Sequence, residues 1–496
     1  MCGPGESADP KPQRVDSKLG VAAFRGSLWL AFINVASKGS QALVAVALAV
    51  FLTPSQLGIA TIATAILNIG QVVQSLGIYD VIARTQRPAR HFAGTVGTLC
   101  VSASAVLVAV IALGADRVTR WISVDAAPYV RVLALALPFM AYSGVQFALM
   151  HRNLDFRRRL WPDAGSALLG ATTTIAACAL GVNEWSVVLG VMVTAVSQPL
   201  LGIVVGVWVP LTWDRQAAGE AFRWARTVGP GALIGVAVLN SDYIVVSRVL
   251  GEAATGTYSL AYRIAFIPYI VVAITLGAVA FPVYTSITRA AVGADISDAF
   301  ARFLHAAVVI TGGLYLTIAL NADRVVLLSS QWAPAAEALR PLCLWGFLMT
   351  LLLMVYVAIR AHGSASPYLA GQAAHLVLLS VSLVLLTPAL GIRGAALAHV
   401  VAVSLVLPMS VLWLVRIGGT DMRSIAGALI RPGIALLLSG LGCLAMRQVA
   451  WLDDPYSAAG GVVVCVSMLL LYVVALVVID GERVRSARVL FHRTES

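Results

Sequence analysis

Charged residues are scarce in this chain of 496 residues. They make up only 11 % of it, whereas 59 % of its residues are hydrophobic and its mean hydropathy is +0.89. Water-soluble domains carry about 25 % charged residues, so the composition excludes a soluble protein. It predicts an all-α polytopic membrane protein, because a helix that crosses a bilayer satisfies its own backbone hydrogen bonds.

Metal, redox and nucleotide motifs are missing as well. None of the six cysteines forms a CxxC pair, and five of them lie within apolar stretches. The sequence contains no phosphate-binding loop, dinucleotide fingerprint or His-Glu zinc motif. We therefore expect no cofactor and no enzymatic activity. Any transport would draw on an ion gradient, the membrane potential or the gradient of the substrate itself.

Long apolar spans are abundant, and fourteen of them follow one another along the chain. Most are close to the length of about 20 residues that a helix needs to cross a bilayer. A polar stretch at 1–20 precedes them and is predicted to be a disordered cytoplasmic tail. The approximate limits of the spans are 28–51, 58–80, 93–114, 132–150, 163–181, 186–209, 229–250, 258–281, 303–321, 341–359, 367–388, 394–415, 429–446 and 457–479.

Basic residues are distributed unevenly between the loops. Most of the 34 Lys and Arg residues fall on one side of the predicted arrangement, as they do in the cytoplasmic loops of membrane proteins. Both termini are therefore predicted to be cytoplasmic, including a basic tail at 481–496. This topology accounts for the net charge of +11 without a nucleic-acid partner. The run Arg157–Arg159 is either a topology signal or a contact with anionic membrane lipids.

Two internal matches indicate that a six-helix unit occurs twice. One match has an offset of 198 residues and aligns Leu52, Gly58 and Ala63 with Leu250, Gly256 and Ala261. The other aligns 131–140 with 340–349. Six spans separate the copies, so both would have the same orientation, as in transporters that bind substrate between two lobes. We predict lobes at 21–210 and 228–417, followed by two further transmembrane helices at 425–480.

Charges occur inside the apolar spans of the segment Asn240–Pro282, which is predicted to be a helical hairpin with a turn at Gly251–Thr257. A rise of about 1.5 Å per residue places Asp242 roughly 13 Å and Arg263 roughly 9 Å below that turn. An ion pair between them would be one interpretation, and a pathway lined by both would be the other. Buried charges of this kind usually face a protein interior or a wet cavity.

Lys38 lies near the middle of the first span, where an unpaired lysine raises the free energy of membrane insertion. A helix kink at Lys38 and Gly39 is the alternative interpretation. With Arg248 and Arg263, the embedded charge is three bases against one acid, Asp242, which suits an anionic substrate such as a diphosphate. We predict Lys38, Arg248 and Arg263 as substrate-binding residues, and Asp242 as an ion-coupling residue or one half of a structural pair. Three histidines also lie in spans and either carry protons or pack between helices: His305, His375 and His399.

Several segments resemble the polysaccharide transporter family of the multidrug/oligosaccharidyl-lipid/polysaccharide exporter superfamily. They are LNSDYIVVSRVLGEAATGTYSLAYRIAFIP, FPVYTSI, FLTPSQLGIATIATAI, HRNLDFRRR and QWAPAAEALRPLCLWG, and the resemblance covers most of residues 24–420. It implies a bacterial plasma-membrane flippase or exporter of polyprenyl-diphosphate-linked sugar units. It also implies two six-helix lobes in a V shape and alternating access, with coupling to an ion such as H⁺ or Na⁺ in some members. Glycan-assembly proteins are the expected functional partners.

Three other functions fit parts of the same pattern. A lipid II flippase, which moves the peptidoglycan precursor, would suit a basic cavity equally well. A cation-coupled multidrug exporter would need acids in the membrane, where one acid faces three bases. A membrane scaffold without transport activity is disfavoured by the embedded charges.

Overall fold

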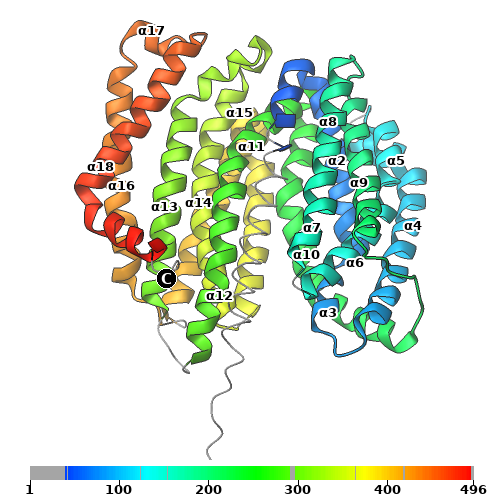
Figure 1. Ribbon diagram of the computed structural model, residues 1–496. Coiled ribbons are helices and arrows are strands. Elements are labelled where there is room, and N and C mark those ends of the chain that lie inside the picture. The colour runs from blue at the N-terminus through cyan, green and yellow to red at the C-terminus, as the bar shows by residue number, and fades with distance from the viewer. Residues whose placement is uncertain are drawn as a thin grey trace, which may run out of the picture.

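The computed structural model describes residues 40–492, apart from residues 42, 123–124, 154, 291–295, 364 and 417–418. Lys38, the predicted tail at 1–20 and most of the first predicted span lie outside the described residues. Within the described part, every regular element is helical (Figure 1). The predicted all-α membrane fold is therefore confirmed.

The first described helix ends at residue 51. The helices that follow in the N-terminal half are α2 (Pro54–Ser75), α3 (Tyr79–Arg84), α4 (Ala89–Ile122), α5 (Ala127–Ala134), α6 (Leu137–Arg152), α7 (Phe156–Leu160), η1 (Trp161–Gly165), α8 (Ser166–Ala179), α9 (Trp185–Val204) and α10 (Arg215–Leu250). Those of the C-terminal half are α11 (Glu252–Pro268), η2 (Tyr269–Ala273), α12 (Ile274–Ala290), α13 (Ser297–Leu320), η3 (Ala322–Leu327), η4 (Ser330–Trp332), α14 (Ala335–Ala361), α15 (Ala365–Arg416), α16 (Met422–Met446), α17 (Ala450–Asp453) and α18 (Ala458–His492).

Ten of the described helices are long and apolar enough to cross a membrane. The number rises to eleven if α5 and α6, which meet at 41°, form one span. Helix α15 has 52 residues, which is about 78 Å and more than twice the thickness of a bilayer core. Gly391, at φ 61°, breaks it into two helices that correspond to the predicted spans 367–388 and 394–415. The total of fourteen spans stays a prediction.

The helices form two groups that lie side by side (Figure 1). Helices α2 to α9 lie in one group, α12 to α14 lie in the other, and α11 and α15 run near the junction. Helices α16 and α18 pack against each other and against α13 at one edge of the bundle, so they are peripheral. The exact limits of the two lobes remain predictions.

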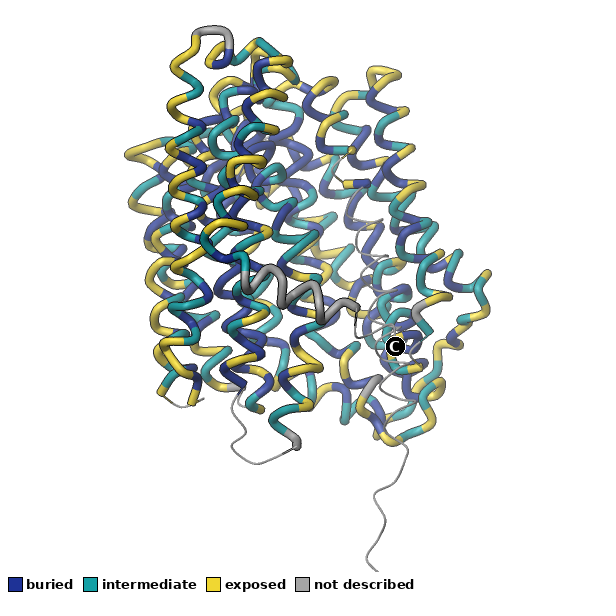
Figure 2. The backbone as a smooth tube through the Cα atoms, turned by 60° about the vertical axis from the view of Figure 1, so that its left-hand side comes forward, coloured by how far each residue is buried: buried dark blue, intermediate teal, exposed yellow. Residues whose placement is uncertain are grey.

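The outward faces of the bundle are apolar. Figure 2 shows exposed positions along the outer helices and buried ones inside. Large aliphatic side chains are strongly exposed there, among them Leu113 at 88 % and Val478 at 78 %. Exposed apolar area of this extent is a liability in water but is the normal surface of a helix in lipid.

Helices α10 and α11 meet at one residue. Gly251, at φ 86°, ends α10, and α11 begins at the next residue, Glu252. The predicted turn at Gly251–Thr257 is therefore wrong. The small polar residues there belong to α11, since the hydroxyl groups of Thr255 and Thr257 donate hydrogen bonds to carbonyls one turn earlier, at 2.8 and 3.0 Å. Glycine alone provides the positive φ that the reversal needs.

Helices α2 and α11 cross at very short range, and the contact joins residues that the internal match aligned. A methyl group on Gly58 would overlap the carbonyl oxygen of Glu252, and one on Gly256 would overlap that of Pro54. Three residues further along each helix, Thr61 Oγ1 donates to Ser259 Oγ at 3.1 Å, and both side chains are buried. The two aligned segments therefore lie against each other in equivalent positions.

Candidate functional site

A cavity of about 390 Å³ begins at this crossing, between α2, α10, α11 and η2. Thr61 belongs both to the crossing and to the cavity wall. The polar side chains that line it are Gln41, Thr61, Thr64, Asn68, Gln71, Asn240, Tyr243, Tyr262 and Arg263. A cavity with polar walls inside an apolar bundle is the usual form of a transport site.

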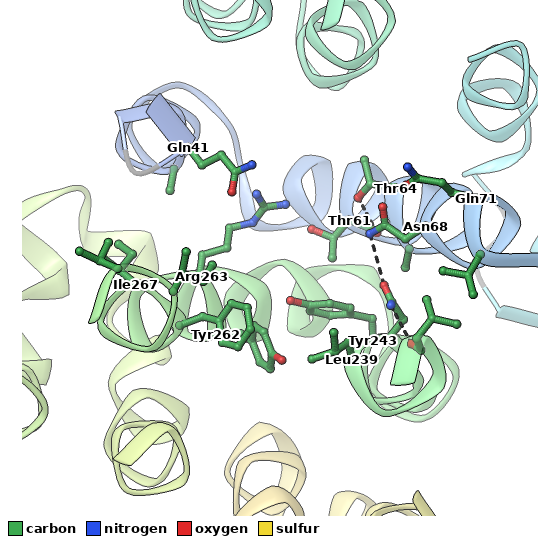
Figure 3. A pocket seen from close by; sticks show the side chains of 18 residues that line it. Gln41, Thr61, Thr64, Asn68, Gln71, Leu239, Tyr243, Tyr262, Arg263 and Ile267 are labelled. Atoms are coloured by element: carbon green, nitrogen blue, oxygen red, sulfur yellow. Dashed lines mark hydrogen bonds between the residues drawn. The ribbon is translucent and has the colours of Figure 1, made fainter. Parts of the chain in front are cut away.

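Arg263 is the one charged residue that lines the cavity among the residues described. Its guanidinium group extends from α11 into the cavity, toward Gln41 and the threonines of α2 (Figure 3). Its buried Nε has no hydrogen-bond partner in the described part of the protein. An unpaired guanidinium in a low-dielectric interior is costly and offers up to five donors to a bound anion.

Polar residues recur along one face of α2. Thr61, Thr64, Asn68 and Gln71 are three or four positions apart, so they fall on one side of the helix and point into the cavity (Figure 3). Asn68 Nδ2 donates to Asn240 Oδ1 on α10 at 3.5 Å. These amides and hydroxyls can both donate and accept, which suits the hydroxyl groups of a sugar.

Aromatic rings form the wall opposite α2. Tyr243, Tyr262 and Phe266 line the cavity, with ring centroids 5.5 Å apart for the tyrosines and 5.4 Å for Tyr262 and Phe266. Such rings provide apolar faces and, in tyrosine, a polar tip. The cavity thus combines one cation, a row of small polar groups and an aromatic surface.

Asp242 does not face the cavity. It is fully buried, and its Oδ2 accepts a hydrogen bond from Tyr258 Oη at 2.9 Å and lies 3.1 Å from His399 Nε2. Within the described residues Asp242 pairs with His399 and not with Arg263, so the interpretation of Asp242 and Arg263 as an ion pair does not hold, while the role of Asp242 stays a prediction. Because α11 starts at Glu252, Arg263 lies about 17 Å along the helix from the turn and not roughly 9 Å, and it faces the cavity instead.

Arg248 lies in the last turn of α10, where its side chain is exposed. A cation at this position interacts favourably with the helix dipole. Arg248 does not line the cavity. Of the predicted substrate-binding residues, the structure therefore places Arg263 in the cavity and Arg248 outside it, while Lys38 lies outside the described residues.

Sequence reasoning missed the polar residues of α2. Their spacing was the available signal, because polar residues at 61, 64, 68 and 71 trace one face of an otherwise apolar span. His399 was considered only as one of several histidines in spans. Its contact with Asp242 joins residues that are 157 positions apart, and no local pattern indicates it.

The fold and the cavity define a class of protein, which is a multi-pass membrane protein with a polar cavity between two groups of helices. The family described as polysaccharide biosynthesis protein matches residues 47–337, more than half of the chain, and the chain belongs to that family. The predicted resemblance is thus confirmed.

Two curated relatives match part of the chain. The lipopolysaccharide biosynthesis protein WzxC of Escherichia coli (strain K12) is 24 % identical over 267 residues, which is 53 % of this chain and 54 % of that protein. The succinoglycan biosynthesis transport protein ExoT of Rhizobium meliloti (strain 1021) is 28 % identical over 162 residues, 32 % of this chain and 33 % of that protein. The matches thus span about half of the first relative and a third of the second.

Solved structures share the fold. The lipid II flippase MurJ in an inward closed conformation has a TM-score of 0.70 and 10 % identity, with 94 % of this chain and 99 % of that chain covered. An inward-facing multidrug resistance MATE family transporter of the MOP superfamily has a TM-score of 0.56 and 16 % identity, with 79 % and 96 % covered. Identities this low indicate a common fold and nothing about the substrate.

Proposed function

We propose that this protein is a flippase or exporter that moves a polyprenyl-diphosphate-linked oligosaccharide or polysaccharide unit across the bacterial plasma membrane. The observation that carries the proposal is the unpaired Arg263 in a polar cavity. A diphosphate would satisfy the guanidinium group by charge-assisted hydrogen bonds. The polar face of α2 and the rings of Tyr243 and Tyr262 would then contact the first sugars.

The proposed mechanism is alternating access between lobes at 21–210 and 228–417. With both termini on the cytoplasmic side, the crossing of α2 and α11 at Gly58 and Gly256 lies toward the outer face. In this conformation the outer end is therefore closed, and the cavity lies on the cytoplasmic side of the closure. Release of the substrate outward would require α2 and α11 to separate.

Three further parts of the proposal go beyond the described cavity. Lys38 would add a second cation near the midplane, and Arg248 would meet the diphosphate once the outer side has opened. Coupling to H⁺ or Na⁺ would supply the driving force. Glycan-assembly proteins would be its functional partners and would receive the lipid-linked glycan that the protein releases. Lipid II fits the same chemistry, and the test below separates the two substrates.

A drug exporter is the weaker alternative. An exporter of cationic drugs needs an acidic cavity, whereas the described cavity is lined by one cation and by neutral side chains. Among the residues that the structure describes, the one fully buried acid near the cavity is Asp242, which does not line it and is already bonded.

Arg263→Gln tests the proposal in a strain that lacks the native gene. Loss of charge-assisted hydrogen bonds worth about 1.5–3 kcal/mol should lower export about 10- to 150-fold. Surface polysaccharide and the accumulated lipid-linked precursor are measured together with the abundance of the protein in the membrane. Arg226→Gln, an exposed arginine of α10, is the matched control and should export as the wild type does.

The nature of the precursor decides between the substrates. Accumulation of lipid II instead of a polyprenyl-linked glycan would select the peptidoglycan alternative. Normal export by an abundant Arg263→Gln protein would contradict the proposed site. If export fell in the Arg248→Gln variant and not in Arg263→Gln, the diphosphate contact would lie at the outer end of α10 instead of in the cavity.

A further inference from the structure

A group of titratable side chains that the proposed substrate site does not use lies directly behind its aromatic wall. Asp242 of α10, Tyr258 of α11 and His399 of α15 are all fully buried. Asp242 Oδ2 is 2.9 Å from Tyr258 Oη and 3.1 Å from His399 Nε2. Three helices therefore converge on a single carboxylate oxygen.

The surroundings of this cluster contain no other acid among the described residues. The groups that face it are Tyr243 of α10, Tyr262 of α11, Trp345 of α14 and His375 of α15, while Arg263 lies near Tyr243 on the cavity side and Tyr315 of α13 lies near Tyr262. His399 Nδ1 and both ring nitrogens of His375 are buried without a hydrogen-bond partner in the described part. The site therefore has unused capacity to hold a proton on either histidine.

The charge of the pair depends on one proton. With a neutral imidazole, the pair carries one negative charge, supported by the hydroxyl group of Tyr258 and the backbone N–H of Tyr243 at 2.9 Å. With an imidazolium, the pair is a neutral ion pair. A lone charge in a dry interior is far more costly than a paired one, so this closed and dry conformation favours the protonated pair.

We propose that His399 and Asp242 form a proton-binding site that takes up and releases one H⁺ in each transport cycle. The inference rests on the proposed function. His399 Nε2–H donates to Asp242 Oδ2 throughout, and an H⁺ from water forms a new N–H bond at the unpartnered Nδ1 of His399, so the pair changes from one negative charge to neutral. Release breaks the same N–H bond and returns H⁺ to water. No other reactant is required.

The depth of the pair indicates the side from which the proton enters. Asp242 lies nine residues before Gly251 and His399 lies eight residues after Gly391, both roughly 12–13 Å below the end at which these helices reverse. This is the end closed by the crossing of α2 and α11. Separation of α2 and α11 would hydrate the pair from the outer side. His375 lies ten residues from the other end of α15 and is placed to pass a proton inward.

The pair and the substrate cavity share a wall. Tyr243 follows Asp242 directly, and the ring centroid of Tyr262 lies 6.0 Å from that of His399, while both tyrosines line the cavity. Tyr258, which donates to Asp242, is on the same helix as Gly256 of the crossing. Protonation after outward release would therefore favour the dry arrangement and return the empty transporter to the present conformation.

The rate at which a disulfide forms across the crossing of α2 and α11 reports the equilibrium between the closed and the open outer side, and it does so without any substrate. Thr61→Cys and Ser259→Cys replace two oxygen atoms that are 3.1 Å apart, in a background without the native cysteines and reconstituted in vesicles of bacterial lipid. Proton concentration is the only variable, from about pH 5.5 to about pH 8.5. Cross-linking should slow at least about threefold as the pH rises, because the outer side opens. Thiol chemistry alone would change in the opposite direction, since thiolate forms at high pH.

His399→Gln should abolish this pH dependence. The matched control is His305→Gln, which removes a half-buried histidine that lies 3.0 Å from another buried aspartate, Asp480, and should keep the wild-type profile. A pH-independent rate in the wild type, or an unchanged profile in His399→Gln, overturns the inference.

A second measurement covers the case in which His399→Gln does not fold. The rings of Trp345 and His399 are 4.9 Å apart, and an imidazolium quenches indole fluorescence at contact. The difference in emission between the wild type and Trp345→Phe should therefore fall on acidification. An emission difference that does not change with pH overturns the inference independently of any histidine variant.

The outcomes separate this inference from the proposed function. If Arg263→Gln exports normally while the pH profile depends on His399, the substrate proposal fails and the proton site stands. If His399→Gln exports glycan as the wild type does at equal abundance, the proton site fails and the proposed function stands.

Discussion

The centre of the protein and its C-terminal edge both contain charged side chains in apolar surroundings. The two regions differ in whether these charges have hydrogen-bond partners. At the edge, Arg324 is buried and bonds to the carbonyl oxygens of Leu452, Asp454 and Ser457 and to the side chain of Asn321. At the centre, Arg263 has a buried Nε that bonds to nothing described. A buried charge whose hydrogen bonds are all made has a structural role, whereas a buried charge without a partner is a candidate to bind a ligand.

The other charges of the edge follow the same rule. Arg447 contacts Asp323 and Asp453, at 3.0 and 2.9 Å, and Asp480 contacts His305 and Arg431, at 3.0 and 3.3 Å. These bonds attach α16 and α18 to α13 and η3. The peripheral helices are thus attached to α13 by polar contacts in addition to two small apolar clusters, one around Met468 and one around Tyr472. Polar contacts add specificity in lipid, where apolar faces have no strong preference for each other.

Arg324→Ala should give the largest effect on stability. It would leave the carbonyl oxygen of Leu452 and the side-chain oxygen of Asn321 without a donor, at about 1–3 kcal/mol each, while the carbonyls of Asp454 and Ser457 would keep their backbone N–H donors. We expect a severe loss of membrane abundance and of the unfolding midpoint in detergent. Arg340→Ala removes a more exposed arginine paired with Asp323 and should cost about 0–1 kcal/mol. Equal abundance of the two variants would contradict the comparison, as would a similar loss in Arg263→Gln.

The sequence predicts the edge and the centre with unequal success. Apolar length identifies the helices on both sides. Arg263 lines the cavity, and its predicted role in substrate binding stays a prediction. The sequence does not identify the partner of Asp242. The helix after Gly251 starts six residues earlier than predicted, and such a shift changes both the depth of Arg263 in the membrane and the side of the helix on which it lies. The contact with His399 also depends on how α15 folds back at Gly391, which no local pattern specifies.

Gly256→Ala should give an intermediate effect, confined to the centre. A methyl group at this position overlaps the carbonyl oxygen of Pro54, so α2 and α11 must move apart, which typically costs about 1–3 kcal/mol. We expect a lower unfolding midpoint and slower cross-linking between cysteines at 61 and 259. Gly219→Ala, in open space on α10, is the control and should be neutral or slightly stabilising. Unchanged cross-linking in Gly256→Ala would show that the crossing is loose.

Asp214→Asn should give the smallest effect, at a site outside both regions. The backbone N–H groups of Gln216 and Ala217 and the nearby Arg87 lower the pKa of Asp214 below its usual value of 3.8. Because the folded pKa is depressed, the stabilisation is present above about pH 4 and is lost as the pH falls through the folded pKa. The unfolding midpoints of wild type and Asp214→Asn should differ slightly at pH 7 and converge below pH 4. A difference that grows on acidification would contradict this assignment.

The polar face of α2 has a consequence for the synthesis of the protein. Its hydropathy of 1.5 is the lowest among the ten candidate spans, which range up to 3.2. The helix that covers this face near the crossing, α11, follows about 200 residues later. At roughly 5–20 residues per second, the ribosome needs on the order of 10–40 s to produce it. During that interval Thr61, Thr64 and Asn68 enter the bilayer before their final neighbour exists. The insertion machinery must therefore shelter α2 from lipid until the second half of the chain arrives.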